Sequence, residues 1–523
     1  MASMQTHTLI KLAILIAALA LILAGLYLVK HYGESRRTKL VDYVLVGLAG
    51  LSLLNFYSFM PFSNRPHYHD MFHYYLGAKY FPEIGYSRLY ACAVKAEAES
   101  DDLLIRALAF DRDIRNLQTD IVVPARPYIL DDTFCKARFS PPRWNEFKSD
   151  VGFFHSRVGI EKTWGKNFLD YGFNPSPVWE LGGGFVSNLK PLSDQSLMWL
   201  KQIDIVFMFG SVACLVWAFG LPTAAFAVIA FTALEAVNLK FCGNSLLRFD
   251  WFFLVVLSVS AMKRGYHILA GLALGYAVAL RVFPAVFALG PFVGLLYAVY
   301  KRQYDLKMAY AKFFGGLILS IAVLVACAST IYGGESMRTF FDNSKKHSKV
   351  IATNNVGLLT ALTYNFDTSL RETLDGRSSD QFEPWRAAKI EARKKVVLKY
   401  AAVVAVALLF FTLAVMSGGA WQALALGASF VPFAWVEVAN YYYVFIAVTA
   451  TLFFSNRKVA FPLLGIGIVS AICELSHQIV EDKVYALFAD EVYTIFSVVV
   501  CIGYLIVWWQ IRRGANPGLK LRS

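Results

Sequence analysis

The sequence predicts an all-α polytopic membrane protein, a helical bundle that carries a mainly helical cap outside the membrane. Three observations support this fold class: the composition, a series of long apolar runs, and one long hydrophilic segment. Of the 523 residues, 57% are hydrophobic and 17% are charged, and the mean hydropathy is +0.49. Because soluble domains are about 45–50% apolar and about 25% charged, this composition excludes a soluble enzyme, a disordered protein and a coiled coil.

Apolar runs recur along the chain, and each is a candidate membrane-spanning helix. They lie near residues 9–29, 40–60, 200–219, 221–240, 246–262, 265–281, 283–300, 309–332, 396–416, 419–437, 439–455, 459–478 and 491–510. Since a spanning helix needs roughly 20 apolar residues, we expect a bundle of about 12–13 transmembrane helices. The first run is long for a signal peptide and its basic flank follows it, so we expect a retained helix with its N-terminus outside.

Basic residues in the short connections indicate the orientation of the bundle. They cluster at 30–39, 263–264, 301–302, 457–458 and 512–513. With thirteen spans, all five clusters fall on the same side, which the positive-inside rule identifies as cytoplasmic. The net charge of +13 follows from this placement, so we expect no nucleic-acid partner.

This orientation divides the chain into five parts. Residues 1–60 form two N-terminal transmembrane helices, 61–199 an extracytoplasmic cap with a juxtamembrane helix, 200–332 a transmembrane bundle, 333–395 a second extracytoplasmic loop, and 396–523 the C-terminal transmembrane helices. The cap holds 16 basic and 17 acidic residues, and its helical pattern starts at 70–81. Cys92 and Cys135 could pair if the cap is exported, which their spacing alone leaves open.

The second loop ends in an amphipathic stretch at 383–395, where Lys and Arg residues surround Trp385. An interfacial helix of this kind could cradle lipid phosphates or anchor the span that follows it. We favour the anchor.

The richest stretch for chemistry begins where the second span leaves the membrane. Asp70, His73, Tyr74 and Gly77 follow i, i+3, i+4, i+7 spacing, which places them on one helix face. A carboxylate among aromatic and imidazole groups close to the membrane suits a general base. Asp is also favoured as a helix N-cap, and the chemistry alone leaves both interpretations open.

His69 and His73 are four residues apart, a spacing that can bind a metal ion from one helix face. The HExxH pattern of metalloproteases is not present in the sequence, and histidines on an aromatic interfacial helix more often form hydrogen bonds. We therefore expect no metal ion and no cofactor, and we interpret both histidines as substrate-binding residues.

Polar and basic side chains gather at the same membrane face. Asn244 and Arg248 follow the fourth span, Arg281 ends the sixth span before Pro284, and Lys346 follows the eighth. Ionisable groups near a bilayer are costly, so their convergence suits a lipid that carries a phosphate. Snorkelling to the surface is the alternative; for Arg281 we favour function, because it lies at a helix–Pro junction.

Four stretches give the chain a resemblance to the GT-C superfamily of membrane glycosyltransferases. Within it, the chain most resembles glycosyltransferase family 87, which contains polyprenyl-phosphate-mannose-dependent mannosyltransferases. The four stretches are 69–75 with 85–90, 243–244, 270–284 and 432–443. The family usually has Lys at the position of Arg281, and it often has Asp-His where this chain has Glu437 and Asn440. Most of the cap, 91–199, lies outside the resemblance.

The resemblance implies a GT-C bundle and an inverting glycosyltransferase of a kind that often needs no metal ion at the active site. A polyprenyl-phosphate-linked sugar enters from the bilayer, basic residues bind its phosphate, and Asp70 takes the proton from a hydroxyl of a glycolipid or glycan acceptor. We expect a multi-pass protein of a bacterial inner membrane, in contact with membrane lipids, with its active site on the extracytoplasmic face. The candidate substrate-binding and phosphate-binding residues are Arg281, His69, His73, Asn244, Arg248 and Lys346.

Two other functions stay open. A flippase or transporter for a lipid-linked sugar would place polar residues near the midplane, whereas here they gather at one face. An O-antigen-type ligase or polymerase would use a diphosphate-linked oligosaccharide in an outside pocket that contains arginines. Asp70 distinguishes a transferase from a flippase, because only a transferase needs its carboxylate.

Overall fold

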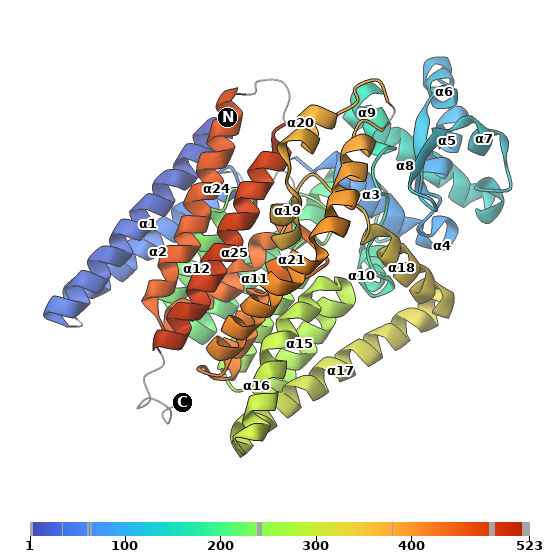
Figure 1. Ribbon diagram of the computed structural model, residues 1–523. Helices are drawn as coiled ribbons and strands as arrows, with labels where there is room; N and C mark the ends of the chain where they lie inside the picture. Colours follow the sequence, from blue (N-terminus) through green and yellow to red (C-terminus); the bar gives the residue numbers. More distant parts are fainter. Residues whose placement is uncertain are drawn as a thin grey trace.

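The computed structural model describes residues 4–33, 35–59, 62, 65–159, 161–237, 243–378, 380–480 and 487–514. Helix accounts for 76% of the structure, and its strands form only two short pairs. The molecule consists of a bundle of long helices and a cap at one end of it (Figure 1). The all-α fold class predicted from the composition is therefore confirmed.

Eight helices among the described residues are long and apolar enough to cross a membrane. This finding supports an integral, multi-pass membrane protein. The eight are α1 (Met4–Tyr32), α2 (Arg36–Phe56), α11 (Asp194–Phe219), the continuous segment of η2 (Phe283–Ala288) and α16 (Leu289–Tyr300), α17 (Tyr304–Tyr332), α21 (Glu383–Val415), η7 (Arg457–Val459) with α24 (Ala460–Val480), and α25 (Ala489–Gly514).

The other five apolar runs form shorter helices, so within the described ranges eight helices, and not the twelve or thirteen expected, are long enough to cross a membrane by themselves. They are α12 (Leu221–Thr232), α14 (Asp250–Lys263), α15 (His267–Leu280), α22 (Ala420–Ala428) and the segment η5 (Asn440–Phe445), α23 (Ile446–Ala450) and η6 (Thr451–Phe454). A 14-residue helix is only about 21 Å long, whereas the hydrocarbon core is about 30 Å thick. These short helices are largely buried inside the bundle.

Close approach between α15 and α17 explains the glycine-rich run in the sixth apolar segment. A Cβ atom at Gly271 would lie 1.9 Å from the carbonyl oxygen of Phe313 on α17. Any side chain there would push the two helices apart, so glycine is required for this contact.

The basic connections gather at one end of the bundle, as the charge pattern predicts. Arg457 forms an ion pair of 3.0 Å with Asp42 near the start of α2, and Lys263 lies over the ring of Phe454. Asn456 donates a hydrogen bond to the backbone of Gln510 near the end of α25. The turn between α16 and α17 and the end of α25 lie at the lower side of Figure 1, opposite the cap.

The cap follows α2 and is mainly helical. It consists of α3 (Tyr68–Lys79), α4 (Phe81–Ile84), α5 (Leu89–Ala98), α6 (Leu103–Phe110), strands β1 (Asp113–Asn116) and β2 (Ile121–Pro124), α7 (Arg126–Leu130), η1 (Lys136–Arg138), α8 (Pro141–Val158), α9 (Glu161–Asn167) and α10 (Pro177–Ser187). The helix expected at 70–81 is α3. Strands β1 and β2 form an antiparallel hairpin, and a disulfide joins Cys92 on α5 to Cys135.

The second extramembrane segment lies between α17 and α21. It contains α18 (Gly334–His347), β3 (Asn355–Val356), α19 (Leu358–Thr363), η3 (Phe366–Thr368) and α20 (Leu370–Thr373). Strand β3 pairs with β4 (Val438–Ala439), which follows η4 (Val431–Phe433). The amphipathic stretch at 383–395 is the first part of α21, where Lys389 forms a 2.8 Å ion pair with Asp490 of α25. These contacts fit the anchoring role that we favoured.

Candidate functional site

Helix α3 begins at the membrane end of the cap and carries three of the predicted site residues. The N-cap of this helix is His67, so Asp70 lies in the first turn and is not the cap. The backbone N–H of His67 donates to the carbonyl of Asn244 at 2.8 Å. Asn244 adopts a φ of 58°, a left-handed conformation that Asn tolerates better than most residues. The loop before α14 therefore fixes the start of α3.

Asp70 faces this loop and forms an ion pair with Arg248. The Arg248 guanidinium lies 3.6 Å from Asp70 Oδ2, and His67 Nδ1 lies 3.3 Å from Oδ1. Burial acts to raise the pKa of Asp70, but the charge of Arg248 and the contact with His67 outweigh it and lower the pKa to about 2. Asp70 Oδ2 is buried and accepts no hydrogen bond from the described residues, so this ionised oxygen is open to a donor.

A second arginine lies beside this pair. Arg281 caps the C-terminal end of α15 in an extended conformation, directly before the 3₁₀ turn that contains Pro284. The Tyr74 ring of α3 lies between the two cations, 4.6 Å from the Arg248 guanidinium and 5.8 Å from that of Arg281. Both arginines line a pocket with Trp251, Tyr441 and other aromatic residues from the loops around α14 and η5.

Arg281 has no acidic partner at ion-pair distance within the described ranges. Its Nε is buried and forms no hydrogen bond with them, and Asp250 acts on it only at longer range. A buried cation without a partner is costly, so an anion that entered this pocket would be stabilised. The cavity has a volume of about 10 Å³, which is room for about one water molecule. A larger anion therefore requires the aromatic side chains to move.

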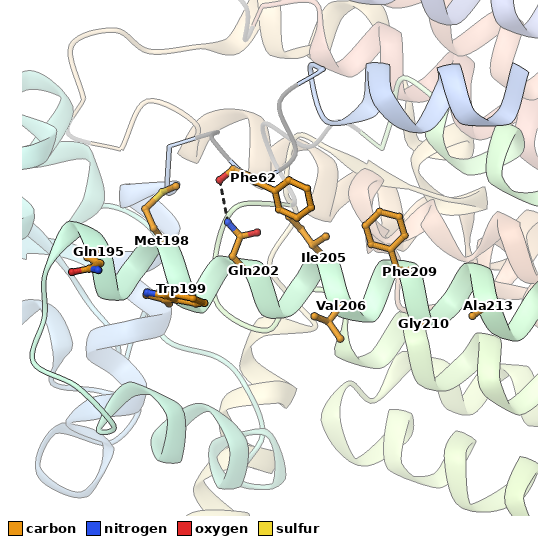
Figure 2. A pocket seen from close by; sticks show the side chains of 10 residues that line it. All are labelled: Phe62, Gln195, Met198, Trp199, Gln202, Ile205, Val206, Phe209, Gly210 and Ala213. Carbon is orange, nitrogen blue, oxygen red and sulfur yellow. Dashed lines mark hydrogen bonds between the residues drawn. The ribbon is translucent and has the colours of Figure 1, made fainter. Parts of the chain in front are cut away.

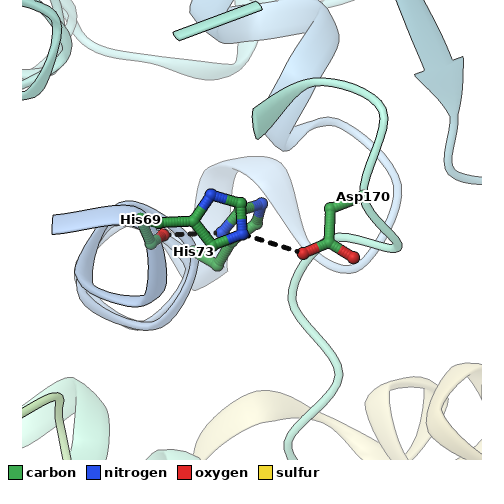
Figure 3. Close-up of side chains that lie close together, drawn as sticks. All are labelled: His69, His73 and Asp170. Carbon is green, nitrogen blue, oxygen red and sulfur yellow. Dashed lines mark hydrogen bonds and ion pairs between the residues drawn. The ribbon is translucent and has the colours of Figure 1, made fainter. Parts of the chain in front are cut away.

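His69 and His73 lie on the part of α3 that faces Asp170 and the loop after α9 (Figure 3). His69 Nε2 lies 3.1 Å from Oδ2 of Asp170, which follows α9, and His69 Nδ1 bonds to the side chain of Asn167. His73 donates from Nδ1 to the carbonyl of His69 and accepts at Nε2 from the Tyr90 hydroxyl at 2.7 Å. Burial lowers the pKa of His73, so its imidazole is neutral. The residues predicted to share one helix face therefore have different partners. Asp70 and Tyr74 lie beside the arginines, whereas His73 contacts Tyr90 of the cap.

Lys346, Glu437 and Asn440 have partners outside the pocket that contains the two arginines. Lys346 at the end of α18 forms a 3.0 Å ion pair with Asp120 of the cap hairpin. Glu437 forms a 2.9 Å ion pair with Arg393 of α21, and Asn440 bonds to Asn354 and Tyr493. Lys346 therefore lies on the cap side of the site, and the late segment contributes Tyr441 and Tyr442 to the arginine pocket.

An apolar groove runs along the outer face of α11 (Figure 2). It is an open groove with a volume of about 840 Å³, lined by Phe62 and by Trp199, Phe209 and other mainly apolar side chains of this helix. On the buried side of α11, Asp204 accepts hydrogen bonds from the backbone N–H groups of Arg248 and Phe249 at 2.8 and 3.0 Å. One helix therefore carries the groove and fixes the loop that presents Arg248.

Two groups at the site were missed by sequence reasoning. Asp170 lies in a cap segment where no motif singles it out, and Tyr441 was noted only as part of an aromatic run. The Asp170-Tyr171-Gly172 turn before a proline-rich stretch is the only local signal, and it indicates a turn rather than a ligand.

Comparison of the chain with protein-family models, with curated proteins and with solved structures finds no match.

Proposed function

We propose that the chain is a GT-C-type membrane glycosyltransferase that moves a sugar from a polyprenyl-phosphate donor to a hydroxyl of a glycolipid or glycan. The observation that carries this proposal is an ionised carboxylate beside two guanidinium groups. Asp70 and Arg248 form an ion pair, and the buried Nε of Arg281 beside them has no hydrogen-bond partner among the described residues. A site with an ionised base and two guanidinium groups suits a reaction in which phosphate leaves.

The two arginines would bind the donor phosphate. Guanidinium groups bind phosphate oxygens with paired, charge-assisted hydrogen bonds, and such contacts stabilise the charge that develops as the sugar–oxygen bond breaks. A single phosphate carries less charge than a nucleotide diphosphate, so arginines can neutralise it without a metal ion on the phosphate. Arg281 is the first candidate because its charge lacks an acidic partner among the described residues.

Asp70 would act as the general base. A pKa of about 2 makes it ionised but weakly basic in the resting state. Two effects strengthen it during the reaction. A phosphate that binds Arg248 weakens the ion pair that lowers the pKa, and an acceptor hydroxyl becomes a strong acid as its oxygen bonds to the sugar. Attack from the side opposite the phosphate inverts the anomeric carbon.

Two features support a lipid donor and an extracytoplasmic reaction. The apolar groove on α11 offers a surface for a polyprenyl chain, next to the loop that carries Arg248. The disulfide between Cys92 and Cys135 suits an oxidising compartment, and the cap lies at the end of the bundle opposite the basic connections. We propose a bacterial inner membrane with this site on its outer face.

The test is sugar transfer in membranes that contain the wild type or Asp70→Asn. The assay offers a panel of polyprenyl-phosphate sugars together with native lipid extract, and Asp111→Asn serves as a matched control because Asp111 is an exposed carboxylate of the cap. We expect transfer by the wild type and the control and its loss in Asp70→Asn. Equal transfer by Asp70→Asn would remove Asp70 as the base. Lipid-linked sugar that crosses the bilayer in both proteins without transfer would favour a flippase.

A further inference from the structure

We propose that His69, His73 and Asp170 form a binding site for one Zn²⁺ ion on the cap side of α3. The three residues each offer one ligand atom, and these atoms all lie within 4.8 Å of one another. Figure 3 shows the two imidazoles on one helix face and the carboxylate opposite them on the loop after α9. This site goes beyond glycosyl transfer and does not depend on it.

The ligand set points to zinc rather than to magnesium or calcium. Zn²⁺ binds imidazole nitrogens and carboxylate oxygens in tetrahedral sites, and sites with three protein ligands leave the fourth position to water or substrate. Mg²⁺ and Ca²⁺ prefer sites made of oxygen ligands, whereas two of the three ligands here are imidazole nitrogens. The i, i+4 spacing of His69 and His73 presents both rings on one face, and Asp170 completes the set from about a hundred residues away.

The ligand atoms lie within 4.8 Å of one another, so side-chain rotations must bring them to zinc-binding distances. With zinc–ligand bonds of about 2.0–2.1 Å, ligand atoms in a tetrahedral site lie about 3.4 Å apart. The His69 Nε2 and Asp170 Oδ2 atoms are already 3.1 Å apart. These two side chains are 38% and 47% exposed, so a hydrated ion has a route into the site.

Neighbouring groups orient the ligand atoms as in known zinc sites. The Nδ1–H of His73 donates to a backbone carbonyl, which leaves the lone pair on Nε2. This atom also lies 3.2 Å from the carbonyl oxygen of Asn167, from which it must turn away to bind zinc. Asn167 holds Nδ1 of His69, and the backbone N–H of Tyr171 donates to Oδ1 of Asp170 at 2.7 Å, which leaves Oδ2. Zn²⁺ would replace the proton that His69 and Asp170 share, so binding releases a proton.

The competing interpretation is a hydrogen-bonded cluster that binds no metal. Its strongest support is Tyr90, whose hydroxyl donates to His73 Nε2 at 2.7 Å and occupies the lone pair that zinc needs. The two interpretations therefore predict different effects of Tyr90→Phe. If the cluster binds zinc, removal of the hydroxyl frees Nε2 and zinc binds more tightly. If the cluster binds no metal, the substitution creates no zinc site.

The experiment measures zinc in the full-length chain, purified in detergent, incubated with ZnCl₂ and then washed free of loose metal. We expect one zinc ion per chain by mass spectrometry, and background levels in His69→Gln and Asp170→Asn. The matched controls are Asp111→Asn and His31→Gln, which change an exposed carboxylate and an exposed imidazole outside the cluster. Both controls should retain the zinc of the wild type.

Cobalt binding gives a second measurement, because a hydrogen-bonded cluster that only stabilises the fold would give no cobalt spectrum. Co²⁺ in a tetrahedral site of nitrogen and oxygen ligands absorbs visible light strongly, so the wild type should gain visible bands that Asp170→Asn lacks. Because Asp170 is half-exposed, its substitution should leave the fold intact, which thermal unfolding checks. The proposal is overturned if the washed wild type contains no zinc, or if Asp170→Asn retains as much zinc as the wild type.

Discussion

The two sides of helix α3 make opposite demands on a ligand. On one side, Asp70 and Tyr74 meet the guanidinium groups of Arg248 and Arg281. On the other side, His69 and His73 meet Asp170, a carboxylate with two imidazoles. Because successive helix residues are about 100° apart, neighbours in the sequence point to different surroundings.

The difference between the two sides shows how little of the chemistry belongs to the helix alone. Asp70 and Asp170 are both ionised carboxylates, yet one is held by a guanidinium and the other by an imidazole. The arginine side suits an anion, and the histidine side suits a cation. Each side acquires its preference from segments that are far from α3 in the sequence, namely the loop at 243–249 and the loop after α9.

The largest expected effect separates the two sides completely. Asp70→Asn should lower sugar transfer by about 10²–10⁴-fold, the contribution of a general base, and leave zinc binding unchanged. Asp170→Asn should abolish zinc binding. Initial transfer rates and zinc content measured on the same preparations check this. If Asp70→Asn also lost its zinc, the two sides would not be independent.

Substitution of Arg281 should have the next largest effect. Arg281→Gln removes a charge-assisted contact to phosphate, which is worth about 1.5–3 kcal/mol, so kcat/KM should fall by about 10–150-fold. Arg281→Lys should retain more activity because it keeps the charge. Since the buried Nε has no hydrogen-bond partner in the described part of the chain, Arg281→Gln should lower activity more than thermal stability.

The matched control for Arg281 is Lys301→Gln, because Lys301 is an exposed cation at the C-terminal end of α16, in the turn to α17. This variant should keep the transfer rate of the wild type. A similar loss of activity in both variants would mean that net charge, rather than the position of Arg281, matters for donor binding.

Gly77→Ala should weaken both sides of α3 together. A Cβ atom at Gly77 would lie 2.3 Å from a ring carbon of Phe173, so the helix or the ring must shift. We expect a loss of about 1–3 kcal/mol in the free energy of unfolding, as for other overpacked positions. Thermal unfolding in detergent measures it.

Gly152→Ala on α8 is the matched control for Gly77→Ala, because nothing lies within 4 Å of a Cβ at that position. Alanine is favoured over glycine in a helix by about 0.5–1 kcal/mol, so this variant should unfold at the same or a higher temperature. Equal unfolding temperatures for the two variants would show that α3 does not need the close contact with Phe173.

The smallest expected effect is a pH dependence of stability on the histidine side. His347 of α18 packs against Tyr171, next to Asp170. Burial and the neighbouring charges of Lys346 and Arg115 lower the pKa of His347 to about 4, although the carboxylates of Asp120 and Asp170 act in the opposite direction.

As pH falls from the ordinary pKa of about 6.5 toward 4, the unfolded chain binds a proton at His347 that the native protein does not bind. The wild type should therefore lose stability over this range. His347→Gln should lose less, as measured by its unfolding temperature across the same range. A larger loss in His347→Gln would contradict the lowered pKa.

Several parts of the site could be predicted from local patterns. The helix expected at 70–81 is α3 at 68–79, because its apolar and polar residues follow a helical period. Arg248 and Arg281 were expected at one membrane face with Asp70, because each follows an apolar run that ends on that face, and the structure brings all three together. Positions at the ends of helices are set by the hydrophobic pattern itself.

Other parts could not be predicted because they depend on contacts between distant segments. Asp170 meets His69 across about a hundred residues, and nothing in its local sequence marks it as a ligand. The long and short apolar helices also look alike in sequence. A run such as 265–281 is as apolar as a full span, but its glycines pack against α17 and its helix ends after 14 residues.

The sequence by itself determined that this is a helical membrane protein, where its basic connections lie and which residues stand at its helix ends. These features follow from composition and period, which act locally on each segment. Only the tertiary structure decided which partners the side chains of α3 contact. The partner of a side chain is fixed by how separate elements pack, and Arg248 and Asp170 reach α3 from parts of the chain that no local pattern connects.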